Sequence, residues 1–177
     1  WPTDLLHPVP ASLDDADAAM LEPLGVAIHS HDLGHVRTAA SVGVFGCGPI
    51  GLLLIQVARA TGAATVVAVD PLPHRREAAK QFGADLVLSP DQARQQGAFA
   101  PVVTDLGVDV AFDVSGTDDA VDLAMRAARP GARVVLAGIP DSDTTTFRAS
   151  LARRKGLTLV MVRRMKEVYP RAIALVE

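Results

Sequence analysis

The feature that most restricts the fold is the stretch SVGVFGCGPIGLLL, residues 41–54, in which three glycines interrupt a run of apolar residues. Gly46, Gly48 and Gly51 form the pattern G-x-G-x-x-G. The β-branched residues before them are typical of a strand, and the apolar residues after them recur at helical spacing. A strand that turns through glycines into a helix is therefore expected here, with Pro49 suited to the first helical turn.

The rest of the chain alternates between short β-branched runs and segments of helical period. Runs that end near residues 46, 70, 88, 113, 138 and 162 predict strands, and further helices are predicted over 73–82, 91–106 and 118–128. Each right-handed crossover must return over the sheet, which makes the strands parallel. We therefore expect an α/β fold, a Rossmann doubly wound six-stranded parallel sheet with helices on both faces.

The residues before the first strand have helical character but no strand partner. Residues 12–35 predict an N-terminal helical segment, with Ser12 as its cap and a kink or split at Pro23. This pattern divides the chain into an N-terminal helical connecting segment, residues 1–40, and a Rossmann domain, residues 41–177.

The glycine pattern indicates a binding site for a diphosphate. The first glycine permits a tight turn, the second lets the diphosphate approach the backbone, and the third lets helix and strand pack closely. Amides at the helix N-terminus, together with the helix dipole, would donate to the anion. The glycine turn therefore predicts dinucleotide binding.

An acid follows the glycines at the distance that dinucleotide-binding folds use. Asp70 ends the second predicted strand, about 20 residues beyond Gly51. Its carboxylate can accept from both ribose hydroxyls of an adenosine and would repel a 2′-phosphate, so we predict NAD as the cofactor. Arg75 and Arg76 could instead meet a 2′-phosphate, lie over the adenine or stay solvated.

Composition excludes several other classes of protein. The chain has 49% hydrophobic and 21% charged residues and a net charge of -3, so nucleic-acid and anionic-membrane partners are not expected. No apolar run is long enough for a membrane span, and no signal peptide is seen, so a cytoplasmic protein is expected. Cys47 is the only cysteine. A disulfide or a thiolate zinc cluster needs more than one cysteine, so neither is expected within this chain. No metal site is predicted in it.

Several segments together resemble the zinc-dependent medium-chain alcohol dehydrogenases, most closely the sorbitol and other polyol dehydrogenases. They are EPLGVAIH, VGVFGCGPIGLLLIQVARATGA, VVAVDPLPHRREAAKQFGAD, VDVAFDVSGT and ARPGARVVLAGIP. The resemblance covers residues 13–177 and implies the cofactor-binding half of an oxidoreductase that transfers hydride between NAD and a secondary alcohol or polyol. It also implies that the zinc ligands lie in a preceding domain and that a final strand and returning segment lie beyond Glu177. This chain alone should bind nucleotide without turnover.

The resemblance assigns roles to individual positions. Two residues are carried over as catalytic: Glu22 would lie near the zinc and its water, and Arg164 would reach the substrate hydroxyls. Arg163 and Met165 depart from the aromatic residues usual in sorbitol dehydrogenases. The residues expected at the cofactor are Gly46, Gly48, Pro49, Ile50, Gly51, Asp70, Arg75, Ser115, Gly116, Ala137, Gly138 and Ile139, with Ser115 and Gly116 on the adenine side and 137–139 at the nicotinamide.

Other readings stay open. The intact protein could be a threonine or simple alcohol dehydrogenase, an NADPH quinone reductase-like relative, or a non-enzymatic nucleotide-binding module. The resemblance also implies a homodimer or homotetramer joined through the apolar edge of the sixth strand. His29, His31 and His35 are interpreted as a solvated or capping cluster and Cys47 as a small buried thiol. The basic residues 153–155 are interpreted as surface charge.

Overall fold

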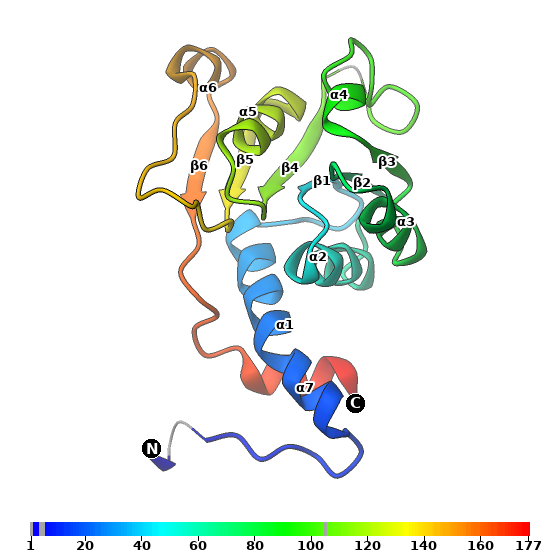
Figure 1. Ribbon diagram of the computed structural model, residues 1–177, viewed down its shortest axis with the longest axis vertical. Helices are drawn as coiled ribbons and strands as arrows, with labels where there is room; N and C mark the ends of the chain where they lie inside the picture. The colour runs from blue at the N-terminus through cyan, green and yellow to red at the C-terminus, as the bar shows by residue number, and fades with distance from the viewer. Residues whose placement is uncertain (1, 4–5, 105) are drawn as a thin grey trace.

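The computed structural model describes residues 2–3, 6–104 and 106–177. In that part of the chain, six parallel strands form one sheet in the order β3-β2-β1-β4-β5-β6 (Figure 1). The strands are β1 (Ser41–Phe45), β2 (Thr65–Val69), β3 (Leu86–Leu88), β4 (Val108–Asp113), β5 (Ala128–Leu136) and β6 (Thr158–Met161). The predicted strand ends and the doubly wound parallel sheet are confirmed.

Helices cover both faces of the sheet, as predicted (Figure 1). Because side chains alternate along a strand, Val42 and Val44 pack on one face and Phe45 on the other. The first face is covered by α1 (Asp15–Gly34), α2 (Pro49–Ala60), α3 (Pro73–Gln81) and α7 (Tyr169–Val176). The second is covered by α4 (Pro90–Ala93), α5 (Asp118–Ala127) and α6 (Ala149–Lys155).

The N-terminal helix differs in detail from its prediction. It begins at Asp15, and the cap is Asp14, whose side chain accepts from the Asp17 amide at 2.8 Å, rather than Ser12. The helix runs on through Pro23, so the predicted split is wrong. It packs along α2 and α7, and a bidentate pair between Arg171 and Asp32 fixes α7 to it. The division of the chain at residue 40 stays a prediction.

The helix predicted over 91–106 is wrong. Only Pro90–Ala93 is helical, with Ser89 and Gln92 forming a capping box, and turns follow. Gly97 adopts a φ of 74°, which ends any helical path, and residue 105 lies outside the described residues. Two helices that the pattern did not indicate, α6 and α7, complete the described chain. No helix in the described ranges is long and apolar enough to cross a membrane.

Candidate dinucleotide-binding site

The strand order changes direction around β1, whose neighbours in the sheet are β2 and β4. In open parallel sheets, ligands bind at this point, beyond the carboxyl ends of the strands. A cavity of about 520 Å³ lies there, and five of the predicted cofactor residues line it: Gly46, Gly48, Asp70, Arg75 and Ser115. The structure therefore brings the glycine turn and the acid together.

The three glycines of the turn meet different surroundings. Gly46 has a φ of 109°, and a Cβ there would lie 3.1 Å from the Ser115 nitrogen. A Cβ at Gly51 would lie 2.0 Å from the Gly46 oxygen, so strand and helix touch there. A Cβ at Gly48 would meet nothing within 4 Å. Gly48 is the N-cap of α2 with Pro49 next to it, and it offers the helix amides to an anion without a side chain in the way.

Asp70 follows β2 and is 2% exposed. Its Oδ2 accepts from the Cys47 amide at 2.7 Å, and its Oδ1 accepts from the Leu72 amide at 2.8 Å. A carboxylate has about four acceptor positions, so two remain for ribose hydroxyls. The acid that would meet the ribose thus also holds the middle residue of the glycine turn.

The two arginines beyond β2 are placed differently. Arg76 donates from Nη1 to the carbonyl oxygens of Asp70 and Pro71, both at 2.8 Å, and so braces the turn. Arg75 lines the cavity and keeps its Nη1 3.9 Å from Asp70 Oδ2. Of the pair, Arg75 is the one positioned to meet a ligand.

Cys47 is fully buried inside the glycine turn. Burial raises the pKa of its thiol to about 12, with the nearby charge of Asp70 adding to the effect and Arg75 and Arg76 opposing it. The thiol is therefore protonated at neutral pH and serves as packing, as predicted.

The second wall of the site consists of two backbone turns in close contact. A Cβ on Gly116 would lie 2.3 Å from the Ile139 oxygen, and one on Gly138 would lie 2.0 Å from the Gly116 nitrogen. These two glycines let the turn after β4 press against the turn after β5. Gly116, Ala137, Gly138 and Ile139 do not line the 520 Å³ cavity, but Ser115 and Thr117, on either side of Gly116, do. The side chain of Ile139 is 88% exposed.

Sequence reasoning missed Asp113, the last residue of β4, which is 1% exposed. Its Oδ1 accepts from the Ser115 amide and hydroxyl, both at 3.0 Å, and from the Gly116 amide at 3.3 Å. Burial raises the pKa of this carboxyl, and the bonds from Ser115 and Gly116 oppose the shift. The available signal was an acid at a strand end two residues before a Ser-Gly pair, much as Asp70 directly follows β2.

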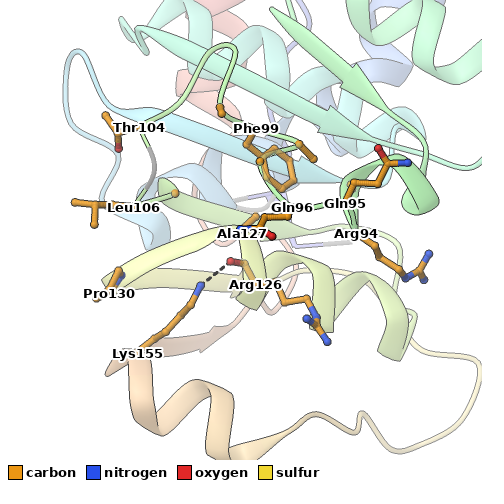
Figure 2. Close-up of a pocket in the computed structure, with 15 residues that line it drawn as sticks. Arg94, Gln95, Gln96, Phe99, Thr104, Leu106, Arg126, Ala127, Pro130 and Lys155 are labelled. Carbon is orange, nitrogen blue, oxygen red and sulfur yellow. Dashed lines mark hydrogen bonds between the residues drawn. The ribbon is translucent and has the colours of Figure 1, made fainter.

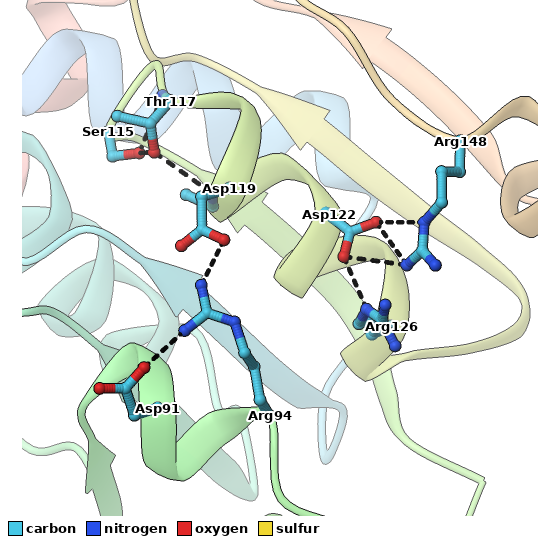
Figure 3. Close-up of polar contacts among 9 residues, drawn as sticks. Asp91, Arg94, Ser115, Thr117, Asp119, Asp122, Arg126 and Arg148 are labelled. Carbon is cyan, nitrogen blue, oxygen red and sulfur yellow. Dashed lines mark hydrogen bonds and ion pairs between the residues drawn. The ribbon is translucent and has the colours of Figure 1, made fainter.

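Ion pairs lie near the start of α5 (Figure 3), and one of their members, Asp119, lines the cavity. Arg94 bridges Asp91, at 2.9 Å, and Asp119, which lines the cavity. Thr117 caps α5 by accepting from the Ala120 amide at 3.2 Å. Further along α5, Asp122 pairs with Arg126 and with Arg148, which belongs to the segment after β5 (Figure 3). Exposed pairs of this kind add little stability.

The residues predicted to be catalytic lie apart from the cavity. Glu22 is exposed on α1, and Arg164 is exposed after β6 with a φ of 54°. Their roles stay predictions.

The histidines of α1 are only partly as predicted. His35 ends the helix with a φ of 50° and donates its amide to the Asp32 oxygen at 3.0 Å, in agreement with a capping role. His29 and His31 are buried rather than solvated, and His31 Nε2 lies 2.9 Å from the Thr61 hydroxyl. Throughout the described ranges, no group of three or more His, Cys, Asp or Glu side chains could hold a metal ion.

Comparison with known proteins gives consistent matches. Residues 49–177 match the family model described as zinc-binding dehydrogenase. The chain is 30% identical over 173 residues to sorbitol dehydrogenase of Bacillus subtilis, covering 96% of this chain and 48% of that protein. It superimposes on 2R,3R-butanediol dehydrogenase of Bacillus subtilis with a TM-score of 0.88 and 28% identity, over 98% of this chain and 50% of that one.

A third match carries a cofactor in its description. It is a protein described as a zinc-binding dehydrogenase from Sinorhizobium meliloti 1021 bound to NADP, with a TM-score of 0.85 and 30% identity over 95% of this chain and 50% of that one. This chain therefore spans about half the length of the relatives it matches. These relatives do not favour a quinone reductase-like protein or a non-enzymatic module.

Proposed function

This chain belongs to the zinc-binding dehydrogenase family, and from that premise we propose that it is the NAD-binding part of an enzyme that moves hydride between NAD and a secondary alcohol or polyol. The observation that carries the proposal is the cavity at the switch in strand order, bounded by the glycine turn and the buried Asp70. Residues 41–177 would form the cofactor domain, and residues 1–40 would connect it to the rest of the enzyme.

The residues around the cavity suit the successive parts of a dinucleotide. The Ile50 and Gly51 amides at the start of α2 would donate to the pyrophosphate, and Pro49, which has no N–H, would lie beside it. Asp70 and Arg75 would hold the adenosine end, with Ser115 and Gly116 on the adenine side. Ala137, Gly138 and Ile139 would meet the nicotinamide, which, when bound, accepts or gives the hydride.

The fixed position of Asp70 favours NAD over NADP. Both of its oxygens accept backbone amides, from Cys47 and Leu72, so the carboxylate cannot turn away from a 2′-phosphate without leaving these buried amides unpaired. Arg75 is held 3.9 Å from Asp70, where its charge is already partly balanced. Like-charge repulsion of the phosphate would therefore outweigh attraction by Arg75.

Isothermal titration calorimetry of this chain with NADH and with NADPH tests the proposal. We expect NADH to bind at least about tenfold more tightly, a difference of about 1.4 kcal/mol. Equal affinity, or a preference for NADPH, would overturn the cofactor assignment. No binding of either at millimolar concentration would overturn the proposed function as a whole.

The zinc that the family name implies does not fit the residues that the structure describes, because they offer no cluster of ligands. The part of this chain in the reaction is accordingly to hold and orient the cofactor. Glu22 and Arg164 would face the substrate only in the complete enzyme. A substrate screen of the complete protein with sorbitol, 2,3-butanediol and threonine, together with its zinc content, tests the alcohol class. Turnover of threonine alone would contradict a polyol substrate.

The edge of the sheet supports a further proposal, a homodimer or homotetramer joined at β6. This strand pairs with β5 on one side, and its Met161 is 69% exposed. An apolar edge strand invites pairing with a second copy. Sedimentation at high protein concentration should show a dimer or larger species, and a pure monomer would argue against the proposal.

A further inference from the structure

Asp113 connects two turns that form one wall of the proposed cofactor site. Its side chain accepts three hydrogen bonds from Ser115 and Gly116, in the turn after β4. Its backbone oxygen accepts the Ala137 amide at 2.8 Å and the Gly138 amide at 3.0 Å, in the turn after β5. One buried residue thus holds both turns.

The two turns are in such close contact that no side chain fits between Gly138 and Gly116. A Cβ at Gly138 would lie 2.0 Å from the Gly116 nitrogen and 2.8 Å from Asp113 Oδ2, so carboxylate and backbone are packed together. Because these groups are in contact, a shift of the Gly116 amide would disturb both its bond to the carboxylate and its packing against Gly138. The position of the whole wall therefore depends on the bonds that Asp113 accepts.

From this geometry we propose that Asp113 is a positioning residue for the dinucleotide: its buried carboxylate holds the turns after β4 and β5 in the conformation that receives the cofactor. It acts through Ser115 and Gly116 and does not touch the ligand. This inference rests on the proposed function, since it presumes that the site takes a dinucleotide. Fixing a binding loop before the ligand arrives lowers the ordering cost of binding.

The same strand provides a matched control. Asp109, near the amino end of β4, accepts from the Ser41 amide and hydroxyl, both at 2.8 Å, just as Asp113 accepts from those of Ser115. Asp109 also pairs with Arg129 at 2.6 Å. It lies at the opposite end of the strand from the cavity, so Asp109→Asn removes a carboxylate with the same two bonds from a serine, though a more exposed one, without disturbing the proposed site.

The experiment compares the wild-type chain with Asp113→Asn and Asp109→Asn. NADH affinity is measured by the fluorescence change of the nicotinamide and by calorimetry at a temperature where all three proteins are folded. Asp113→Asn should weaken NADH binding by about tenfold, because a neutral amide replaces a charged acceptor of backbone amides. Asp109→Asn should lower the unfolding temperature and leave NADH affinity within about twofold of wild type.

Amide hydrogen exchange gives a second readout that a general loss of stability would not produce. In Asp113→Asn, the Ser115 and Gly116 amides should exchange faster, with the Ser41 amide unchanged, and in Asp109→Asn the reverse should hold. If Asp113→Asn does not fold, Asp113→Glu keeps the charge but displaces the turn, and it should weaken NADH binding in the same direction.

The outcomes separate the two proposals. Wild-type binding with equal affinity in Asp113→Asn, or an equal loss in both variants, would overturn the role of Asp113 and leave the proposed function standing. Failure of the wild-type chain to bind NADH would instead overturn the proposed function. Selective loss in Asp113→Asn, with faster exchange confined to its turn, would support both.

Discussion

Gly48 and Gly51 lie three residues apart in one turn, yet a methyl group would have opposite effects at the two positions. At Gly51 it would collide with the Gly46 oxygen, and at Gly48 it would enter open space. We therefore predict that Gly51→Ala lowers the free energy of unfolding by about 3 kcal/mol or prevents folding. Gly48→Ala should stay within about 0.5 kcal/mol of wild type but lose most of its NADH affinity, because the methyl group would stand where the diphosphate approaches.

Urea unfolding and NADH titration of both variants check this contrast. Each variant serves as the control for the other, since both place the same methyl group in the same turn. A stable Gly48→Ala protein that binds NADH normally would contradict the position assigned to the diphosphate. A fully stable Gly51→Ala protein would contradict the close packing of strand and helix.

At the scale of single residues, the sequence predicted those positions whose role depends on local pattern. The spacing of three glycines and the acid at a strand end predicted Gly46 and Asp70 as cofactor residues, and the structure places both at one cavity. Asp113 was not predicted, because its partners are two backbone amides and a hydroxyl that only the folded turn places around it. The burial of His29 and His31 was not predicted for a similar reason, since it depends on how α1 lies on the neighbouring elements.

Among the elements, α6 is joined to the end of α5 by a lysine in its last turn. Lys155, interpreted from the sequence as surface charge, donates from Nζ to the carbonyl oxygens of Met125 at 3.1 Å, Arg126 at 2.6 Å and Ala128 at 2.6 Å. Figure 2 shows it reaching the end of α5 beside a surface cavity. Partial burial lowers the pKa of this amine, with Arg126 adding to the effect. Lys155 therefore caps the carboxyl end of α5, where a cation is favoured.

We predict that Lys155→Met lowers the free energy of unfolding by about 2 kcal/mol, because three carbonyl oxygens lose a charged donor. The control is Arg154→Met, at an exposed neighbouring position on α6, which should change stability by less than about 0.5 kcal/mol. Urea unfolding followed by far-UV circular dichroism measures both. Equal effects of the two substitutions would show that Lys155 acts only as surface charge.

Strand positions followed from the sequence more reliably than helix positions. Buried parallel strands are continuous β-branched runs, which local reading detects. The segment 91–106 has helical spacing but is broken at Gly97, and α6 is a seven-residue helix with three basic residues in its last turn and no apolar stripe. Long-range contacts such as those of Lys155 and Arg148 hold such short helices, and a local pattern does not contain them.

For the molecule as a whole, two buried histidines predict how stability depends on pH. Burial lowers the pKa of His29 and of His31 below the ordinary 6.5, with Lys166 adding to the shift at His29, Asp32 opposing it at both, and Arg171 adding to it at His31. Below pH 6.5 the unfolded chain therefore binds protons that the folded chain does not. The free energy of unfolding should fall as the pH drops from 6.5 toward the folded-state pKa values, by at most about 1.4 kcal/mol per pH unit for each histidine.

Guanidinium unfolding at pH 7.5, 6.5 and 5.5 measures this dependence, with His31→Gln as the control. The variant should lose less stability than wild type between pH 6.5 and 5.5. Asp113 acts in the opposite sense, since burial raises its pKa, but its contribution is common to both proteins and cancels in the comparison. An unchanged slope in His31→Gln would contradict the lowered pKa of this histidine.

The cysteine inside the glycine turn has a practical consequence. With its pKa raised to about 12 and no exposed surface, the Cys47 thiol is almost never a thiolate under cellular conditions. We therefore expect that peroxide and disulfide exchange do not modify this thiol, so oxidising conditions would not change how the turn binds a nucleotide. A maleimide could react with the thiol only when the turn opens transiently, so the rate of labelling would report how often the turn opens.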